Sequence, residues 1–163
     1  MDSDPPKLLL IEDDRSIRRF LAISMESNGF RITEADTAES GLRAAVSEPP
    51  DAIVLDLGLP DGDGLDVIRK IREWSTVPII VLSAREREHE KVLALDTGAD
   101  DYLTKPFGVG ELLARVDRAR RTERHAVDRH RHAKRILSQR SRLESALPDR
   151  THSHLQAGRR RDP

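Results

Sequence analysis

The 163-residue chain has no cysteine, only three Phe, one Tyr and one Trp, and no apolar run that approaches the length of a membrane span. The absence of cysteine excludes disulfide bonds and thiolate metal ligands, which fits a reducing cytoplasm. A bilayer span needs about 20 mostly apolar residues, so we expect no segment to cross a membrane. The acidic start, MDSDPP, lacks the basic-then-apolar order of a signal peptide. These features predict a cytoplasmic protein.

The net charge of −1 conceals two regions of opposite sign. Residues 1–117 contain 14 Lys+Arg and 24 Asp+Glu, a balance of −10, whereas residues 118–163 contain 14 and 5, a balance of +9. Charged residues make up 35% of the chain, so part of it is expected to lie outside a packed core. This split indicates two regions with different physical roles.

Short apolar segments alternate with segments of helical periodicity along residues 7–121. Asp14 and Thr37 precede helical segments as N-caps, and Gly29 and Gly98 follow helical segments as stops. The alternation predicts an α/β fold, with a doubly wound parallel sheet and helices on both faces. The predicted strands are 7–11, 30–35, 51–56, 77–82 and 101–103, and the predicted helices are the segment between Asp14 and Gly29 and the segments 37–47, 64–73, 86–97 and 109 to about 121.

Polar side chains stand where the predicted strands end. Glu12 and Asp13 follow the first strand, Asp56 ends the third, Ser83 follows the fourth and Lys105 follows the fifth. In open parallel sheets ligands collect at the carboxyl ends of the strands, so we expect these side chains to gather at one edge. Three carboxylates there would repel one another unless a hard cation such as Mg²⁺ lay among them.

This set of side chains suits phosphoryl transfer, which depends on charge neutralisation and positioning. Asp56 is the candidate nucleophile because it lies centrally and precedes the flexible turn LGLPDGDG, whose Gly58 carbonyl could reach the metal. Taken singly, each residue has a plainer interpretation, because Asp at a strand end is most often a turn or cap residue. The stretch PDGDG also hints at a calcium loop, but the required glutamate is missing.

Four blocks of the sequence resemble the receiver domain of bacterial two-component response regulators. They are LLLIEDDRSIRRFL, PDAIVLDLGLPDGDGLDVIRKIR, VPIIVLSA and GADDYLTKPFGVGELLARV, and the resemblance spans residues 6–121. The residue sequence of these blocks is similar to that of the potassium-uptake regulators of the OmpR/PhoB group. The resemblance implies a flavodoxin-like fold with five strands in the order 2-1-3-4-5, five helices, and a receiver domain over residues 1–121.

The resemblance also implies residue roles. Asp56 would accept a phosphoryl group from a sensor histidine kinase, and Glu12, Asp13, Asp56 and the Gly58 carbonyl would hold Mg²⁺. Glu12 departs from the commoner aspartate, so its longer side chain is expected to act through water. Lys105 would contact the phosphoryl group.

A switch and a dimer are implied as well. Ser83 would follow the phosphoryl group, Tyr102 would swing inward with Ser83, and a cis bond is expected before Pro106. Phosphorylation would promote a homodimer through the face formed by segments 86–97, 101–103 and 109–121. The dimer would then regulate transcription. The candidate residues of this face are Lys91, Asp100, Asp101, Glu111 and Arg115; the plainer interpretation of these charges is a solvated surface.

The basic segment 122–163 lacks the strand alternation of the winged-helix DNA-binding domain that follows the receiver in the resembled group. A helical stretch over 127–147 could extend the last helix, and the segment from Pro148 is expected to be disordered. Three interpretations stay open: a truncated or frameshifted remnant of a DNA-binding domain, a basic arm that binds nucleic acid non-specifically, or a solvated tail.

Two other functions compete with the phosphoryl-accepting switch. A phosphatase of the haloacid-dehalogenase type would also use an aspartyl phosphate, but it needs a second aspartate two residues beyond the nucleophile, where this chain has Gly58. A receiver-like interaction module that never takes phosphate is the third possibility. We expect no catalytic turnover beyond Mg²⁺-dependent self-phosphorylation and autodephosphorylation.

Overall fold

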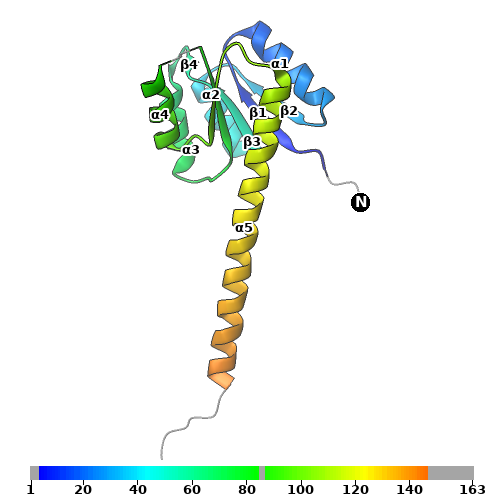
Figure 1. Cartoon of the computed structure of the whole chain (residues 1–163), viewed down its shortest axis with the longest axis vertical. Coiled ribbons are helices and arrows are strands. Elements are labelled where there is room, and N and C mark those ends of the chain that lie inside the picture. The colour runs from blue at the N-terminus through cyan, green and yellow to red at the C-terminus, as the bar shows by residue number, and fades with distance from the viewer. Residues whose placement is uncertain (1–3, 85–86, 147–163) are drawn as a thin grey trace, which may run out of the picture. The chain divides into compact units, whose positions relative to one another are not determined.

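A computed structural model describes residues 4–84 and 87–146, and the chain divides into two units, Met1–Ala126 and Val127–Pro163. The first unit contains a five-stranded parallel sheet in the order β2-β1-β3-β6-β7 (Figure 1). This confirms the predicted flavodoxin-like order, because β6 and β7 are the fourth and fifth strands of the sheet along the chain. The sheet strands are β1 (Lys7–Ile11), β2 (Arg31–Ala35), β3 (Ala52–Asp56), β6 (Ile79–Ser83) and β7 (Asp101–Thr104).

Helices cover both faces of this sheet (Figure 1). One apolar cluster joins alternate strand residues such as Leu9 and Ile53 to α2, α3 and α4, and the other joins Leu10 and Val54 to α1 and α5. Every residue of β3 and β6 is buried, as expected for central strands that are covered on both sides. The helices are α1 (Arg15–Ser27), α2 (Ala38–Ser47), α3 (Gly64–Arg72), α4 (Glu88–Thr97) and α5 (Val109–Ala146).

The predicted caps set the helix ends. The Asp14 carboxylate accepts the Ile17 N–H at 2.9 Å, and Thr37 forms a capping box with Ser40 at the start of α2. Gly29 follows α1 with φ of 89° and Gly98 follows α4 with φ of 127°, a backbone region that strongly favours glycine.

A two-stranded antiparallel hairpin was not predicted from the sequence. It joins β4 (Gly58–Leu59) and β5 (Gly62–Asp63) within the turn after Asp56. Asp61 in this turn accepts the backbone N–H groups of Ala38 and Glu39 at 2.7 and 3.0 Å. The hairpin loop thereby caps α2 and is held beside the carboxyl edge of the sheet.

The last helix is longer than the segment first predicted. It was expected to end near Arg121, with a separate stretch over 127–147 that could extend it, and α5 runs without a break to Ala146. Glu86, the predicted start of the fourth helix, and the segment from Pro148, predicted to be disordered, lie outside the described residues. Within the described ranges, no helix is both long enough and apolar enough to span a bilayer.

Candidate functional site

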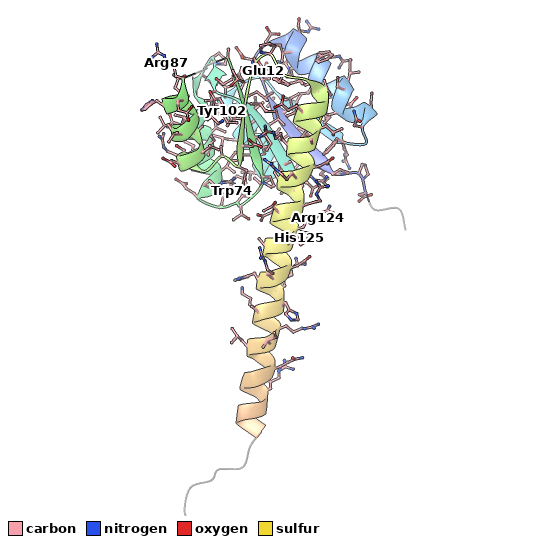
Figure 2. All side chains as sticks on the ribbon, viewed as in Figure 1. Glu12, Trp74, Arg87, Tyr102, Arg124 and His125 are labelled. Carbon is pink, nitrogen blue, oxygen red and sulfur yellow. The ribbon has the colours of Figure 1, made fainter. Side chains whose placement is uncertain are left out.

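The strand register brings the predicted site residues to one edge. Ile11 pairs with Leu55 in the parallel ladder between β1 and β3, so the residues that follow them, Glu12 and Asp56, are neighbours. Ser83 pairs with Thr104 between β6 and β7, which places Lys105 at the same edge. Figure 2 shows Glu12 at this carboxyl edge of the sheet. The sequence pattern therefore predicted the meeting of these side chains correctly.

The carboxylates of Glu12, Asp13 and Asp56 form a compact cluster. One oxygen from each lies within 4.8 Å of the others. The Lys105 Nζ atom donates to Glu12 Oε2 and to Asp56 Oδ2, each at 3.1 Å. Glu12 is 1% exposed and Asp56 9%, whereas Asp13 is exposed. The cluster thus has a buried floor of two carboxylates joined by an ammonium, and an open side at Asp13.

Burial and crowding change the acidity of Glu12. Its pKa is raised from 4.5 to about 7, first by burial and then by the charge and hydrogen bonding of Asp56, while Lys105 opposes the shift. Burial lowers the pKa of Lys105, but its contacts with Glu12 and Asp56 outweigh that effect and the net shift is upward. Lys105 is therefore a firmly charged group, and Glu12 keeps its proton to a higher pH than an ordinary glutamate.

The donor set fits a divalent hard cation. Once Glu12 has lost its proton, three carboxylates face one ammonium at this edge, which leaves negative charge in excess. Carboxylate oxygens are the ligands that Mg²⁺ prefers, and an open side leaves room for the waters that Mg²⁺ keeps. The Gly58 N–H donates to Asp56 Oδ1 at 3.1 Å, which fixes the turn close to the cluster. Coordination by the Gly58 carbonyl stays a prediction.

Ser83 lies beside the cluster, and Tyr102 lies within the core. Ser83 is 2% exposed, and its carbonyl accepts the Lys105 N–H at 2.8 Å. The Tyr102 side chain is buried among the apolar residues that face α2, α3 and α4, with 5% exposure. The Lys105–Pro106 bond is cis, as the resemblance implied. The inward swing of Tyr102 with Ser83 stays a prediction.

Most residues predicted to form a dimer face have partners within this chain. Arg115 contacts both carboxylate oxygens of Asp101 at 2.9 Å and Glu111 at 3.4 Å. Asp100 accepts from Arg72 at 2.9 Å and from the Ile79 N–H at 2.8 Å. Lys91 lies on α4 and is exposed. Their role between two copies of the chain stays a prediction.

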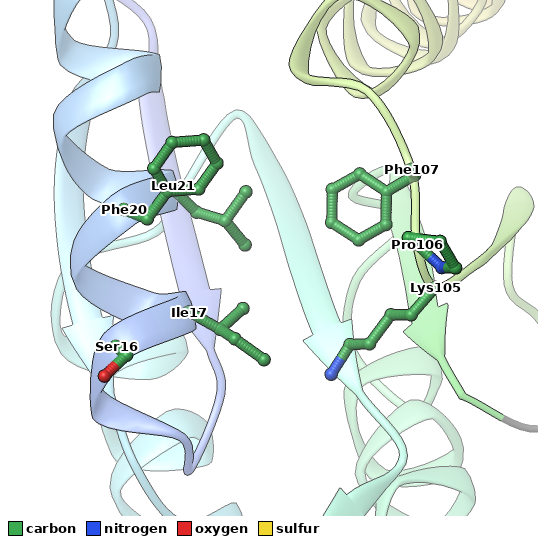
Figure 3. Close-up of a pocket in the computed structure, with 7 residues that line it drawn as sticks. All are labelled: Ser16, Ile17, Phe20, Leu21, Lys105, Pro106 and Phe107. Atoms are coloured by element: carbon green, nitrogen blue, oxygen red, sulfur yellow. The ribbon is translucent and has the colours of Figure 1, made fainter.

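An apolar groove of about 520 Å³ opens next to the cluster (Figure 3). Figure 3 shows Ile17, Phe20 and Leu21 of α1 facing Pro106 and Phe107 across it. Phe20 is 59% exposed, which is unusual for a large aromatic side chain and marks the groove as a candidate contact surface.

Sequence reasoning missed Arg18, which lies beside the acidic pair. Its NH1 atom donates to the Glu12 carbonyl at 2.8 Å, and its Nε atom pairs with Glu34 at 3.4 Å. Side chains on a helix point back toward its N-terminus, and Arg18 lies four residues after the N-cap Asp14. That spacing was the available signal, because an arginine there can reach the preceding loop.

The fold and this cluster define a receiver domain, and the chain belongs to the response regulator receiver domain family. The family's sequence profile matches residues 8–117. The family assignment sets aside the haloacid-dehalogenase alternative, in agreement with Gly58 at the position where that chemistry needs an aspartate.

The curated relatives include transcriptional regulatory proteins named KdpE. The chain is 58% identical over 109 residues to KdpE of Escherichia coli K12, covering 67% of this chain and 48% of that protein. It is 49% identical over 121 residues to KdpE of Mycobacterium tuberculosis, covering 74% of this chain and 54% of that protein. The chain thus spans about half the length of these relatives.

Solved receiver domains share the fold. The receiver domain of the Francisella response regulator 1452 superposes with a TM-score of 0.69 at 34% identity, covering 72% of this chain and 98% of that one. The BeF3-activated receiver domain of Klebsiella pneumoniae RstA gives a TM-score of 0.68 at 27% identity, covering 71% and 98%. The coverage of those chains is nearly complete, so the similarity is to whole receiver domains.

Proposed function

We propose that Asp56 is the phosphoryl acceptor of this receiver and that a sensor histidine kinase is the donor. The observation that carries the proposal is the contact of Lys105 Nζ with Asp56 Oδ2 at 3.1 Å, beside the carboxylates of Glu12 and Asp13. A nucleophilic carboxylate needs a cationic neighbour that stabilises the incoming phosphoryl oxygens, and Lys105 is placed for that role.

The transfer conserves atoms and electrons. An Asp56 oxygen forms a bond to phosphorus while the bond from phosphorus to the donor's imidazole nitrogen breaks, and the electron pair stays on that nitrogen. Lys105 is within reach of the new phosphoryl oxygens, because it already contacts the oxygen of Asp56. The product is an aspartyl phosphate, and water regenerates the carboxylate.

Glu12, Asp13, Asp56 and the Gly58 carbonyl are the proposed Mg²⁺ ligands. Bound Mg²⁺ would neutralise the charge of the phosphoryl oxygens at this edge. Glu12 must lose its proton before it can act as a ligand or hydrogen-bond a metal-bound water. Because Lys105 holds one Glu12 oxygen and the Asp14 N–H donates to the other at 3.1 Å, the Glu12 side chain is held in place for either role.

The apolar groove is the proposed docking surface for the kinase. A donor histidine must approach Asp56 from solvent, and the groove lined by α1 and the Pro106–Phe107 segment borders Lys105 (Figure 3). An amphipathic helix of the kinase would cover Phe20 and Phe107 there. The chain is proposed to act in the cytoplasm.

Phosphorylation is proposed to promote a homodimer through α4, β7 and α5. The phosphoryl group would draw the Ser83 hydroxyl and allow Tyr102 to repack, which changes the distant face. A pair between copies that involves Arg115 would require it to exchange its contacts with Asp101 and Glu111 for those of a second copy. We expect light scattering to show more dimer after phosphorylation, and an unchanged mass would contradict the switch.

Regulation of potassium-uptake genes is proposed from the resemblance of the sequence to the potassium-uptake regulators, and it is supported by relatives that are named KdpE. It concerns whole proteins about twice as long as the matched region, so the receiver alone supplies only the signal input. The three interpretations of residues 122–163, and a domain boundary near residue 121, remain predictions. Non-specific binding of DNA by that basic segment would weaken steeply with salt.

The test is phosphoryl incorporation from acetyl phosphate and Mg²⁺, followed by intact mass spectrometry. The wild-type chain should gain one phosphoryl group, and Asp56→Asn should gain none. Asp66→Asn is the matched control, because Asp66 is an exposed aspartate whose only described ion pair is with Arg69 on the same helix. Continued release of inorganic phosphate by turnover would favour a phosphatase, and absence of incorporation in wild type would refute the proposal.

A further inference from the structure

We propose that Arg18 is a positioning residue that holds the backbone of the acidic pair in the geometry needed for Mg²⁺. The proposal deepens the function above and depends on Mg²⁺ binding at Glu12 and Asp13. Arg18 lies in the first turns of α1, and its side chain is 17% exposed.

The contacts of Arg18 are with the backbone of the loop and not with its carboxylates. NH1 donates to the Glu12 carbonyl at 2.8 Å and lies 3.4 Å from the Asp13 carbonyl. The Glu12 N–H in turn donates to the Ala35 carbonyl at 3.0 Å. Both backbone groups of Glu12 are therefore held, the N–H by β2 and the carbonyl by Arg18.

This choice of partners leaves the metal ligands available. An arginine that faced the carboxylates would form bidentate pairs with them and compete with a cation. Arg18 instead donates hydrogen bonds to backbone carbonyls, and its Nε atom forms an ion pair with the carboxylate of Glu34 on β2 at 3.4 Å. The ion pair with Glu34 orients the guanidinium, so Glu34 is part of the same support.

Two physical effects of Arg18 have opposite signs for Mg²⁺ affinity. Its positive charge repels a cation, so removal of the charge alone would tighten binding. Its hydrogen bonds hold the loop that carries two ligands, and loss of such orienting contacts typically weakens metal binding by 10-fold or more. The short, partly buried contact with the Glu12 carbonyl at 2.8 Å and the neutralising Glu34 make the second effect larger.

The experiment is calorimetric titration of the full chain with Mg²⁺, for wild type, Arg18→Gln, Arg18→Lys and the matched control Arg19→Gln. Arg19 is adjacent and exposed, and no side-chain partner of it is found within the described residues. We expect Arg18→Gln to raise the Kd for Mg²⁺ about 10-fold and Arg19→Gln to leave it unchanged. Arg18→Lys should raise the Kd less, because the longer lysine side chain can still bring a donor to the Glu12 carbonyl, whereas the shorter glutamine cannot.

A second measurement separates positioning from a general loss of structure. In acetyl phosphate labelling, Arg18→Gln should need more Mg²⁺ for half-maximal rate but recover the wild-type rate at saturating Mg²⁺, with thermal unfolding still cooperative. Tighter or unchanged Mg²⁺ binding by Arg18→Gln would overturn the inference and leave the proposed function intact. Failure of the wild-type chain to bind Mg²⁺ would overturn both.

Discussion

Gly64 is the first residue of α3 and packs against the end of the strand that carries Asp56. A Cβ atom added there would lie 2.7 Å from the Leu57 Cα atom and 3.0 Å from the Asp56 carbonyl oxygen. Both are backbone atoms, so relief of the clash requires the strand end to move. The Gly64 N–H also donates to the Leu57 carbonyl at 3.1 Å, which ties α3 to the same segment.

The Gly64→Ala variant should therefore be destabilised despite the better helix propensity of alanine. Overpacking of a tight contact costs about 1–3 kcal/mol, and replacement of glycine by alanine in a helix returns up to about 1 kcal/mol. We expect a net loss of about 1–2 kcal/mol. With a urea slope of about 2 kcal/mol per molar, the unfolding midpoint should fall by roughly 0.5–1 M.

Gly110 provides the matched control because it also lies in the first turn of a helix. No atom lies within 4 Å of a Cβ built at Gly110. The Gly110→Ala variant should raise the stability by about 0.5 kcal/mol, since only the entropy of the unfolded chain changes. Urea unfolding of both variants decides the matter: a Gly64→Ala midpoint at or above that of wild type would refute the packing argument.

Two further predictions concern the charge of Glu12 and the hydrogen bonds of Arg72. In metal-free buffer, raising the pH from about 5 through 7 should reduce stability. The folded-state pKa of Glu12 (about 7) exceeds its ordinary value of 4.5, so the stability present at low pH is lost as the proton leaves. Glu12→Gln should flatten this slope in chemical unfolding, and equal slopes for variant and wild type would contradict the argument. Arg72→Met removes hydrogen bonds to the carbonyls of Gly98 and Val77 and to the Asp100 carboxylate, and should lower the free energy of unfolding by about 2 kcal/mol. The control Arg69→Met, at an exposed ion pair, should leave the free energy of unfolding almost unchanged in the same assay.

The sheet and the placement of the site were predictable from the sequence because both depend on strand ends. Runs such as LLLI and AIVL form buried parallel strands, and parallel strands bring their carboxyl ends to one edge. Glu12, Asp56 and Lys105 therefore meet regardless of the exact helix boundaries. The β4–β5 hairpin was not predictable in this way, since two-residue strands carry no periodic signal.

Partner choice was the part that sequence could not supply. Asp101 and Arg115 were both predicted to lie on a dimer face, and the structure shows in addition that they pair with each other within one chain, 14 residues apart in sequence. Which pairing forms depends on how β7 and α5 are placed in three dimensions. The position of Arg18, four residues after Asp14, carried a signal, but which backbone carbonyls it contacts is set by the path of the loop.

The position of Lys105 links the acidic pair to the acceptor. Its N–H donates to the Ser83 carbonyl, so its backbone is anchored to β6 and only its side chain is free to follow a new phosphoryl group. The side chain now divides its charge between Glu12 and Asp56. A shift of Nζ toward phosphoryl oxygens on Asp56 would weaken its contact with Glu12, which would then depend on the cation alone for compensation. Phosphorylation and Mg²⁺ binding should therefore be energetically coupled. Lys105→Ala should weaken that coupling, whereas Mg²⁺ binding to the unphosphorylated site should tighten because an ammonium that contacts two proposed ligands is removed.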